Sequence, residues 1–291
     1  MKVKLKRFFD TTFFLIMLSL LLYFYISLAV SRNFFLIKWS AVDVSEVLQS
    51  TFSFDSVVFH LHESFQFQGP IYGGIAGMLF VSIRKHLWPL KAPRTRTYRG
   101  LVLHDILLNS LHVALACYAA FLLIFFLHIA FATPADVERG LRIARAPDIL
   151  PPRSTNGASL FLDLFGVDFY FDHRKLYYFM VYSVQYGYAP FLFSIMGSTL
   201  GLVFEKRYQV LLVTVLTYYA LTLFFNRLGG MNIMPSWLHT LLQYLEPARL
   251  CIPNSIRNVA TIPFFILQLI PTLLPSGLII SNQIRHAKVR V

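Results

Sequence analysis

Six apolar blocks in the sequence approach or exceed the length that an α-helix needs to cross a lipid bilayer, which is about 20 residues. The blocks lie at about 11–31, 65–83, 103–132, 176–204, 208–225 and 259–280. Only 14% of the residues are charged, whereas soluble domains carry about 25%. We therefore expect an all-α polytopic membrane protein with six transmembrane helices, in which residues 1–291 form a single transmembrane domain.

The placement of Lys and Arg predicts how the spans are oriented. If the amino terminus is inside, the inner segments are 1–10, 84–100, 205–207 and 282–291, and the outer segments are about 32–68, 133–175 and 226–258. The inner segments hold 15 Lys and Arg, and the much longer outer segments hold 11, together with 11 acidic residues. Short cytoplasmic loops are enriched in Lys and Arg. We therefore expect both termini in the cytoplasm and interpret the first block as an uncleaved span rather than a signal peptide.

Several classes of function have no support in the sequence. The net charge of +12 does not indicate nucleic acid, because the basic residues gather in the inner segments. The chain has no phosphate-binding loop, nucleophile elbow, HExxH pair or dinucleotide-binding turn, so we expect neither an enzyme nor a cofactor in this chain. His60, His62 and Glu63 lie close together, but two histidines two positions apart on a helix face apart, and we expect no metal site. Cys117 and Cys251 give no disulfide framework.

The inner segment 84–100 has no acidic residue and is interrupted by two prolines. Its six basic residues are Arg84, Lys85, Lys91, Arg94, Arg96 and Arg99. One interpretation is a docking loop for a cytoplasmic partner. The other is the ordinary basic charge of an inner loop beside anionic lipid.

A polar stripe in the third block is the first candidate for a transport pathway. Asp105, Asn109 and His112 are spaced so that they share one face of a helix, and ionisable residues at membrane depth are often functional. The structural alternative is that Asp105 meets Arg96 or Arg99, and that Asn109 bonds a neighbouring helix.

The aromatic fourth block supplies further candidate pathway residues, which are Tyr182, Gln185 and Tyr186. An interfacial aromatic belt also explains the tyrosines of this block. Pro190 predicts a kink within it. Pro263, Pro271 and Pro275 predict an irregular last helix.

Two GxxxG motifs, Gly73–Gly77 and Gly197–Gly201, predict close crossings between membrane helices. Outside the membrane, residues 134–146 and 235–247 both have the pattern of a short amphipathic helix lying at the interface. The second of these helices comes directly before the last span.

This layout resembles the permease subunit of a type-2 ABC exporter. The segment MPSWLHTLLQYLEPAR (residues 234–249) is similar to the stretch that precedes the last span in that family, and PRTRTYRGLVL (residues 93–103) is similar to the stretch that re-enters the membrane after the coupling segment. The chain departs from the family in lacking a conspicuous Glu near the start of the inner loop and in its longer outer segment 133–175.

The resemblance implies two permease subunits, as a homodimer or heterodimer, and a separate dimer of ATP-binding-cassette ATPases docked below residues 84–100. ATP and Mg²⁺ would then be bound by that partner, which would drive alternating access in a prokaryotic plasma membrane. The aromatic fourth block favours an amphiphilic substrate such as a peptide, an antibiotic or a lipid-like molecule. The alternatives are a proton-coupled secondary transporter that uses Asp105, Asn109 and His112, and a non-transporting immunity or scaffold protein.

Overall fold

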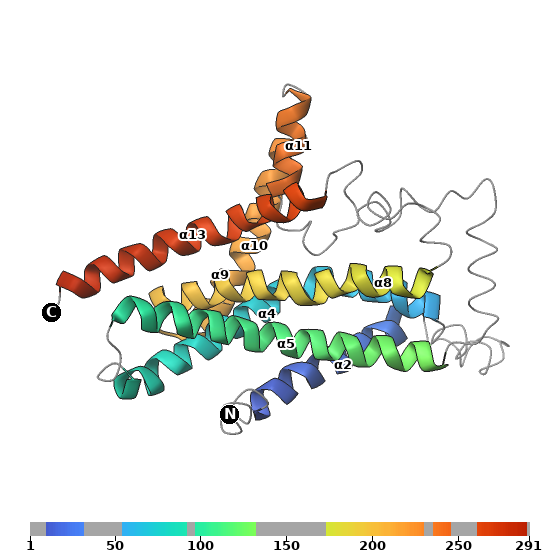
Figure 1. Cartoon of the computed structure of the whole chain (residues 1–291), viewed down its shortest axis with the longest axis horizontal. Coiled ribbons are helices and arrows are strands. Elements are labelled where there is room, and N and C mark those ends of the chain that lie inside the picture. The colour runs from blue at the N-terminus through green and yellow to red at the C-terminus, as the bar shows by residue number, and fades with distance from the viewer. Residues whose placement is uncertain are drawn as a thin grey trace. The chain divides into compact units, whose positions relative to one another are not determined.

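The computed structural model describes residues 10–31, 54–91, 97–131, 173–229, 235–245 and 261–289. These residues are helical almost throughout and form no strand (Figure 1). The first three helices are α2 (Thr11–Ser31), α4 (Phe54–Lys91) and α5 (Tyr98–Phe131). They are followed by α8 (Arg174–Ser183), the π-helix η3 (Val184–Tyr188) and α9 (Ala189–Val203). The last three are α10 (Arg207–Gly229), α11 (Ser236–Leu245) and α13 (Thr261–Val289).

Among the residues that the structure describes, four helical stretches are long and apolar enough to cross a membrane. They are Thr11–Leu28, Tyr98–His128, Val184–Val203 and Arg207–Phe225, and they coincide with the first, third, fourth and fifth predicted blocks. The second and sixth blocks lie in α4 and α13, which are helical as predicted. Whether these two helices also cross the membrane, and whether both termini are cytoplasmic, stays a prediction.

The helices extend beyond several predicted boundaries. The second apolar block ends at Ile83, yet α4 continues to Lys91. Its 38 residues make a helix of about 57 Å, longer than the hydrocarbon layer of about 30 Å. The basic residues Arg84, Lys85 and Lys91 therefore belong to a helix rather than to the expected loop. The backbone of His60 and His62 also lies in α4.

The chain divides into two compact units by its internal contacts. Unit 1 comprises residues 1–66, 116–186 and 252–259, and unit 2 comprises 67–115, 187–251 and 260–291. The helices α4 and α5 contribute residues to both units. This division neither confirms nor contradicts the prediction that residues 1–291 form a single transmembrane domain.

In unit 1, one stripe of α2 is buried. Its members recur every three or four residues, and they are Phe13, Ile16, Leu20, Phe24 and Leu28. The remaining faces of α2 carry exposed Phe14, Leu18, Leu22 and Ile26. A helix that is apolar on both its buried and its exposed faces suits a lipid environment, in which the outer face meets hydrocarbon.

Unit 2 is organised around α9. This helix contacts α10 and α13, and the stretch that contains it is 72% buried, against 17% for the stretch in α10. On α13, the polar residues Gln268, Thr272 and Ser276 are buried, whereas Ile270 and Leu274 are exposed. Polar groups inside and apolar groups outside are the reverse of a soluble amphipathic helix and are expected in lipid.

The prolines of α9 and of α13 act differently. The π-helical turn Val184–Tyr188 comes directly before the Ala189–Pro190 start of α9. Because a proline ring collides with the carbonyl four residues earlier, the wider π-turn accommodates Pro190, where the sequence predicted a kink. By contrast, α13 continues as a helix through Pro271 and Pro275, so these prolines do not interrupt it. Hydroxyls of Thr272 and Ser276 donate to the carbonyl oxygens of Gln268 and Thr272 in the preceding turn of α13.

The amphipathic helix predicted at 235–247 is present as α11, which contacts α10 and α13. The other predicted interfacial helix, at 134–146, lies outside the described residues.

Candidate functional site

The two GxxxG motifs meet each other in unit 2, which confirms the predicted close crossing. Gly73 and Gly77 of α4 lie against Gly197 and Gly201 of α9. A Cβ atom added at Gly197 would clash with the carbonyl oxygen of Gly73 and lie 2.7 Å from its carbonyl carbon. Only glycine allows the two backbones to come this close.

Asn109 of α5 joins this crossing. Its Nδ2 donates to the carbonyl oxygen of Ala76 at 2.8 Å and to the hydroxyl of Ser198 at 2.8 Å. The side chain is buried, so a single amide links α5 to α4 and to α9. The structural alternative for Asn109, a bond to a neighbouring helix, is therefore the one observed.

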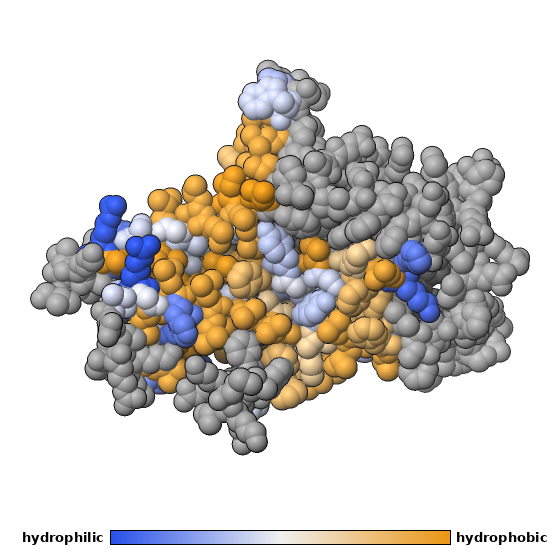
Figure 2. Space-filling view, in the orientation of Figure 1, coloured by the Kyte–Doolittle hydropathy of each residue, from blue (hydrophilic) through white to orange (hydrophobic). Residues whose placement is uncertain are grey.

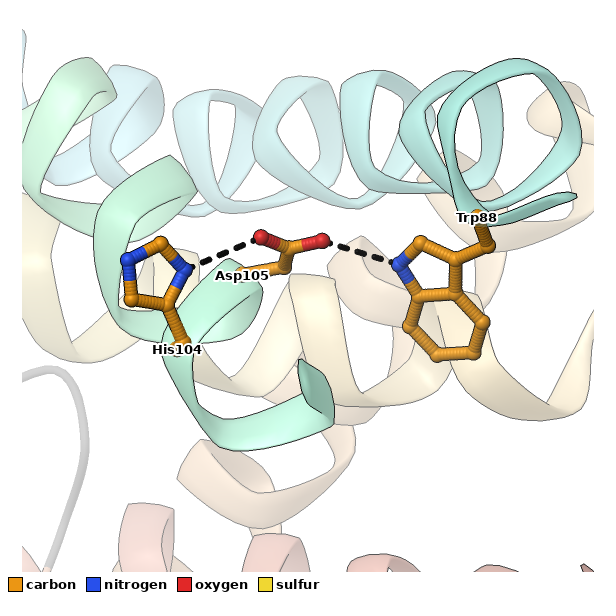
Figure 3. A network of polar contacts seen from close by, with 3 residues as sticks. All are labelled: Trp88, His104 and Asp105. Atoms are coloured by element: carbon orange, nitrogen blue, oxygen red, sulfur yellow. Dashed lines mark hydrogen bonds and ion pairs between the residues drawn. The ribbon is translucent and has the colours of Figure 1, made fainter. Parts of the chain in front are cut away.

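Polar side chains form a cluster where α4 ends and α5 begins. We call this part of unit 2 the α4–α5 end. Asp105 is buried there, and its two oxygens have separate partners (Figure 3). The indole N–H of Trp88 donates to Oδ2 at 2.9 Å, and Nδ1 of His104 lies 3.1 Å from Oδ1. Trp88 comes from α4 and the other two residues from α5, so the carboxylate connects the two helices.

Trp88 is itself held by aromatic packing. Its ring meets Phe80 and Tyr98 edge to face, with ring centroids 5.8 and 5.7 Å apart. Edge-to-face contacts of this kind add to the stability from burial. The indole therefore has a fixed orientation toward Asp105.

Arg84 connects the α4–α5 end to the end of α9. Its guanidinium donates to the carbonyl oxygen of Leu202 and to that of Phe204, the latter at 3.1 Å. The last carbonyls of a helix have no partner within the helix and carry partial negative charge. A guanidinium is well suited to bind them, so Arg84 caps α9 from α4.

The other basic residues of segment 84–100 are placed differently. Lys85 and Arg99 are exposed, whereas Arg94 and Arg96 lie outside the described residues, as does the side chain of Lys91. Figure 2 shows hydrophilic side chains on the side of the view where α13 ends and α5 begins, next to a largely hydrophobic surface. The third residue of the polar stripe, His112, is half-buried.

The candidate pathway residues of the fourth block lie in unit 1 and are buried. The hydroxyl of Tyr186 donates to the carbonyl oxygen of Leu61 at 2.9 Å, and its ring stacks on Phe121 with centroids 5.4 Å apart. Tyr182 lies near the same phenylalanine ring. Gln185 is fully buried within η3, and π-turns inside α-helices occur frequently at functional sites.

Trp88, His104 and Ser198 were not predicted as site residues. One feature of the sequence could have indicated Trp88, which is a large aromatic residue with an N–H donor within a basic segment. The bonds of His104 and Ser198 depend on tertiary packing, which sequence spacing does not show.

The described helices define a multi-pass helical membrane protein by length and composition. Comparison with models of protein families, with curated proteins and with solved structures found no match to this chain.

Proposed function

We propose that the chain is the membrane-spanning permease subunit of an exporter driven by a separate ATPase. In this proposal all six apolar blocks cross a prokaryotic plasma membrane, and both termini face the cytoplasm. Two permease subunits pair to form the pathway, and an ATPase dimer binds ATP and Mg²⁺ below segment 84–100. The layout of spans and basic loops supports this orientation.

The observation that carries the proposal is that segment 84–100 is hydrogen-bonded to other helices through residues in its first turns. Arg84 holds the end of α9, and Trp88 holds Asp105 of α5. A displacement of this segment would therefore pull on α5 and α9 directly. A segment that transmits the motion of an ATPase needs such connections, whereas a loop that only carries basic charge does not.

The helix that receives this displacement is also the centre of unit 2. Because α9 contacts α10 and α13 and crosses α4 at the glycine motifs, it cannot shift without its neighbours. Packed helices move between discrete arrangements rather than deforming continuously. This behaviour suits alternating access.

The fourth block supports an amphiphilic substrate such as a peptide, an antibiotic or a lipid-like molecule. Its buried residues combine aromatic surface at Tyr182 and Tyr186 with one amide at Gln185. A substrate with apolar groups and few charges fits such a lining when the pathway opens.

The test is purification of the tagged full-length chain from its native membranes, followed by identification of the proteins that accompany it. We expect an ATPase with a phosphate-binding loop, and we expect the double substitution K85E/R99E to remove it. The control is R285E, which reverses an exposed charge on α13 and should retain the ATPase. Retention of the ATPase by K85E/R99E would contradict docking at this segment, and absence of any ATPase from the wild-type preparation would contradict the proposed class.

Transport in proteoliposomes separates this function from a proton-coupled carrier. With ATP and the ATPase present but no ion gradient, we expect transport by the wild type and by D105N. Transport that requires a proton gradient and is lost in D105N would favour the carrier.

A further inference from the structure

The turn between α9 and α10 places two exposed basic side chains at the start of the least buried span. Lys206 and Arg207 are both exposed, and α10 begins at Arg207. The candidate span in α10 also begins there, which puts both cations at the boundary between hydrocarbon and water. Basic side chains at such a boundary lie at the depth of lipid phosphates.

An apolar stripe extends from these cations along α10. Tyr208, Leu212 and Leu216 are 63%, 60% and 56% exposed, and their spacing of four residues puts them on one face of the helix. The opposite face is buried through Val210 and Tyr218. The exposed stripe is therefore not a part of the packed core of unit 2.

The Lys206 side chain leans toward this stripe. Its Nζ lies 5.9 Å from the centre of the Tyr208 ring, within the range of a cation–π contact. The turn that carries Lys206 is held from the other side, because Arg84 donates to the carbonyl of Phe204. The ammonium group therefore lies beside the aromatic ring at which the apolar stripe begins.

We propose that the start of α10 binds an anionic phospholipid. Lys206 and Arg207 hold the phosphate of the headgroup, and an acyl chain lies along Tyr208, Leu212 and Leu216. Glu205 is an exposed acid in the same turn, but the two cations outnumber it. The lipid follows from charge complementarity, because the inner leaflet is anionic.

A second copy of the chain fits the same surface less well. If two copies met through this face of α10 about a twofold axis, Lys206 and Arg207 of one copy would approach the same residues of the other. That arrangement places like charges together, whereas an anionic lipid neutralises them. The lipid site depends on neither transport nor an ATPase partner, but it rests on the proposed orientation, which places Lys206 and Arg207 at the anionic inner leaflet.

Native mass spectrometry of the delipidated full-length chain tests the site, with phosphatidylglycerol as the anionic probe and phosphatidylcholine as the zwitterionic one. We expect the wild type to bind phosphatidylglycerol at least about tenfold more tightly. At about fivefold for each cation removed, R207Q should weaken this binding about fivefold and K206Q/R207Q about 25-fold. The variant R285Q, which removes an exposed cation from α13, should bind as the wild type does.

Three outcomes would overturn the site. Equal affinity for the two lipids would indicate a non-specific lipid annulus, and an equal loss in R285Q would indicate a general effect of net charge. Lipid-free dimers that dissociate in L212Q, which disrupts the exposed apolar stripe, would assign the surface to a second copy. Circular dichroism of each variant checks that the helices are intact, and its binding of phosphatidylcholine should be unchanged.

Discussion

Replacement of Gly197 by alanine is expected to destabilise the crossing of α4 and α9. The added Cβ would clash with the Gly73 carbonyl oxygen and lie 2.7 Å from its carbon, whereas ordinary contacts begin at 3.4 Å. The helices must therefore separate by at least about 0.7 Å, the difference between these two distances. Because both close atoms belong to the backbone, no rotation of a side chain relieves the clash.

This separation also strains the bonds made by Asn109. Its Nδ2 lies 2.8 Å from an acceptor on each helix, and a shift of about 0.7 Å would lengthen one of these distances to about 3.5 Å, near the limit of a hydrogen bond. Overpacking costs about 1–3 kcal/mol, and a hydrogen bond between membrane helices contributes about 0.6 kcal/mol. We therefore expect G197A to lower the free energy of unfolding by about 2–4 kcal/mol.

The matched control is G277A, because a Cβ added at Gly277 has no atom within 4 Å. Both substitutions exchange a helical glycine for alanine, so the difference between them removes the contribution of helix propensity. The assay is reversible unfolding of the purified full-length chain in mixed micelles. A difference between the two variants below about 0.5 kcal/mol would refute the close crossing.

Three further substitutions test the polar contacts of unit 2. N109A should lower the free energy of unfolding by about 1–2 kcal/mol because it removes two interhelical bonds, and a double-mutant cycle with S198A should show coupling; additive effects would contradict the shared bond. W88F should cost about 1–2 kcal/mol because it removes the donor to a buried carboxylate, and it should cost less in a D105N background; the same cost in both backgrounds would contradict the bond. R84Q should leave ATPase binding intact and reduce transport about tenfold, so unchanged transport would contradict the role of Arg84 as a connection to α9.

The helices of this fold could be predicted from sequence because the thickness of the membrane fixes the length of an apolar run. The run from Thr11 ends within one residue of α2, and the fifth block likewise falls within α10. The end of α4 could not be predicted in this way. In its last turns, from Arg84 to Lys91, Arg84 and Trp88 bond to other helices, and the length of an apolar run does not show such bonds.

The candidate site could be predicted only in part for a related reason. The spacing of Asp105 and Asn109 placed them on one helical face, and the glycine motifs indicated a close approach. Spacing did not show that the indole of Trp88 reaches Asp105, or that Arg84 binds carbonyls 118 and 120 residues further along the chain. Such long-range partners depend on how the helices cross.

The measurement that tests the central claim most directly is labelling of single cysteines in intact cells with a membrane-impermeant maleimide. The substitutions are K85C in α4 and W237C in α11, introduced separately into a chain in which Cys117 and Cys251 are replaced by serine. Both parent residues are exposed. We expect W237C to be labelled in intact cells and K85C only after the membrane is permeabilised, because the proposed orientation places segment 84–100 in the cytoplasm. Labelling of K85C in intact cells would contradict the orientation and the proposed function together.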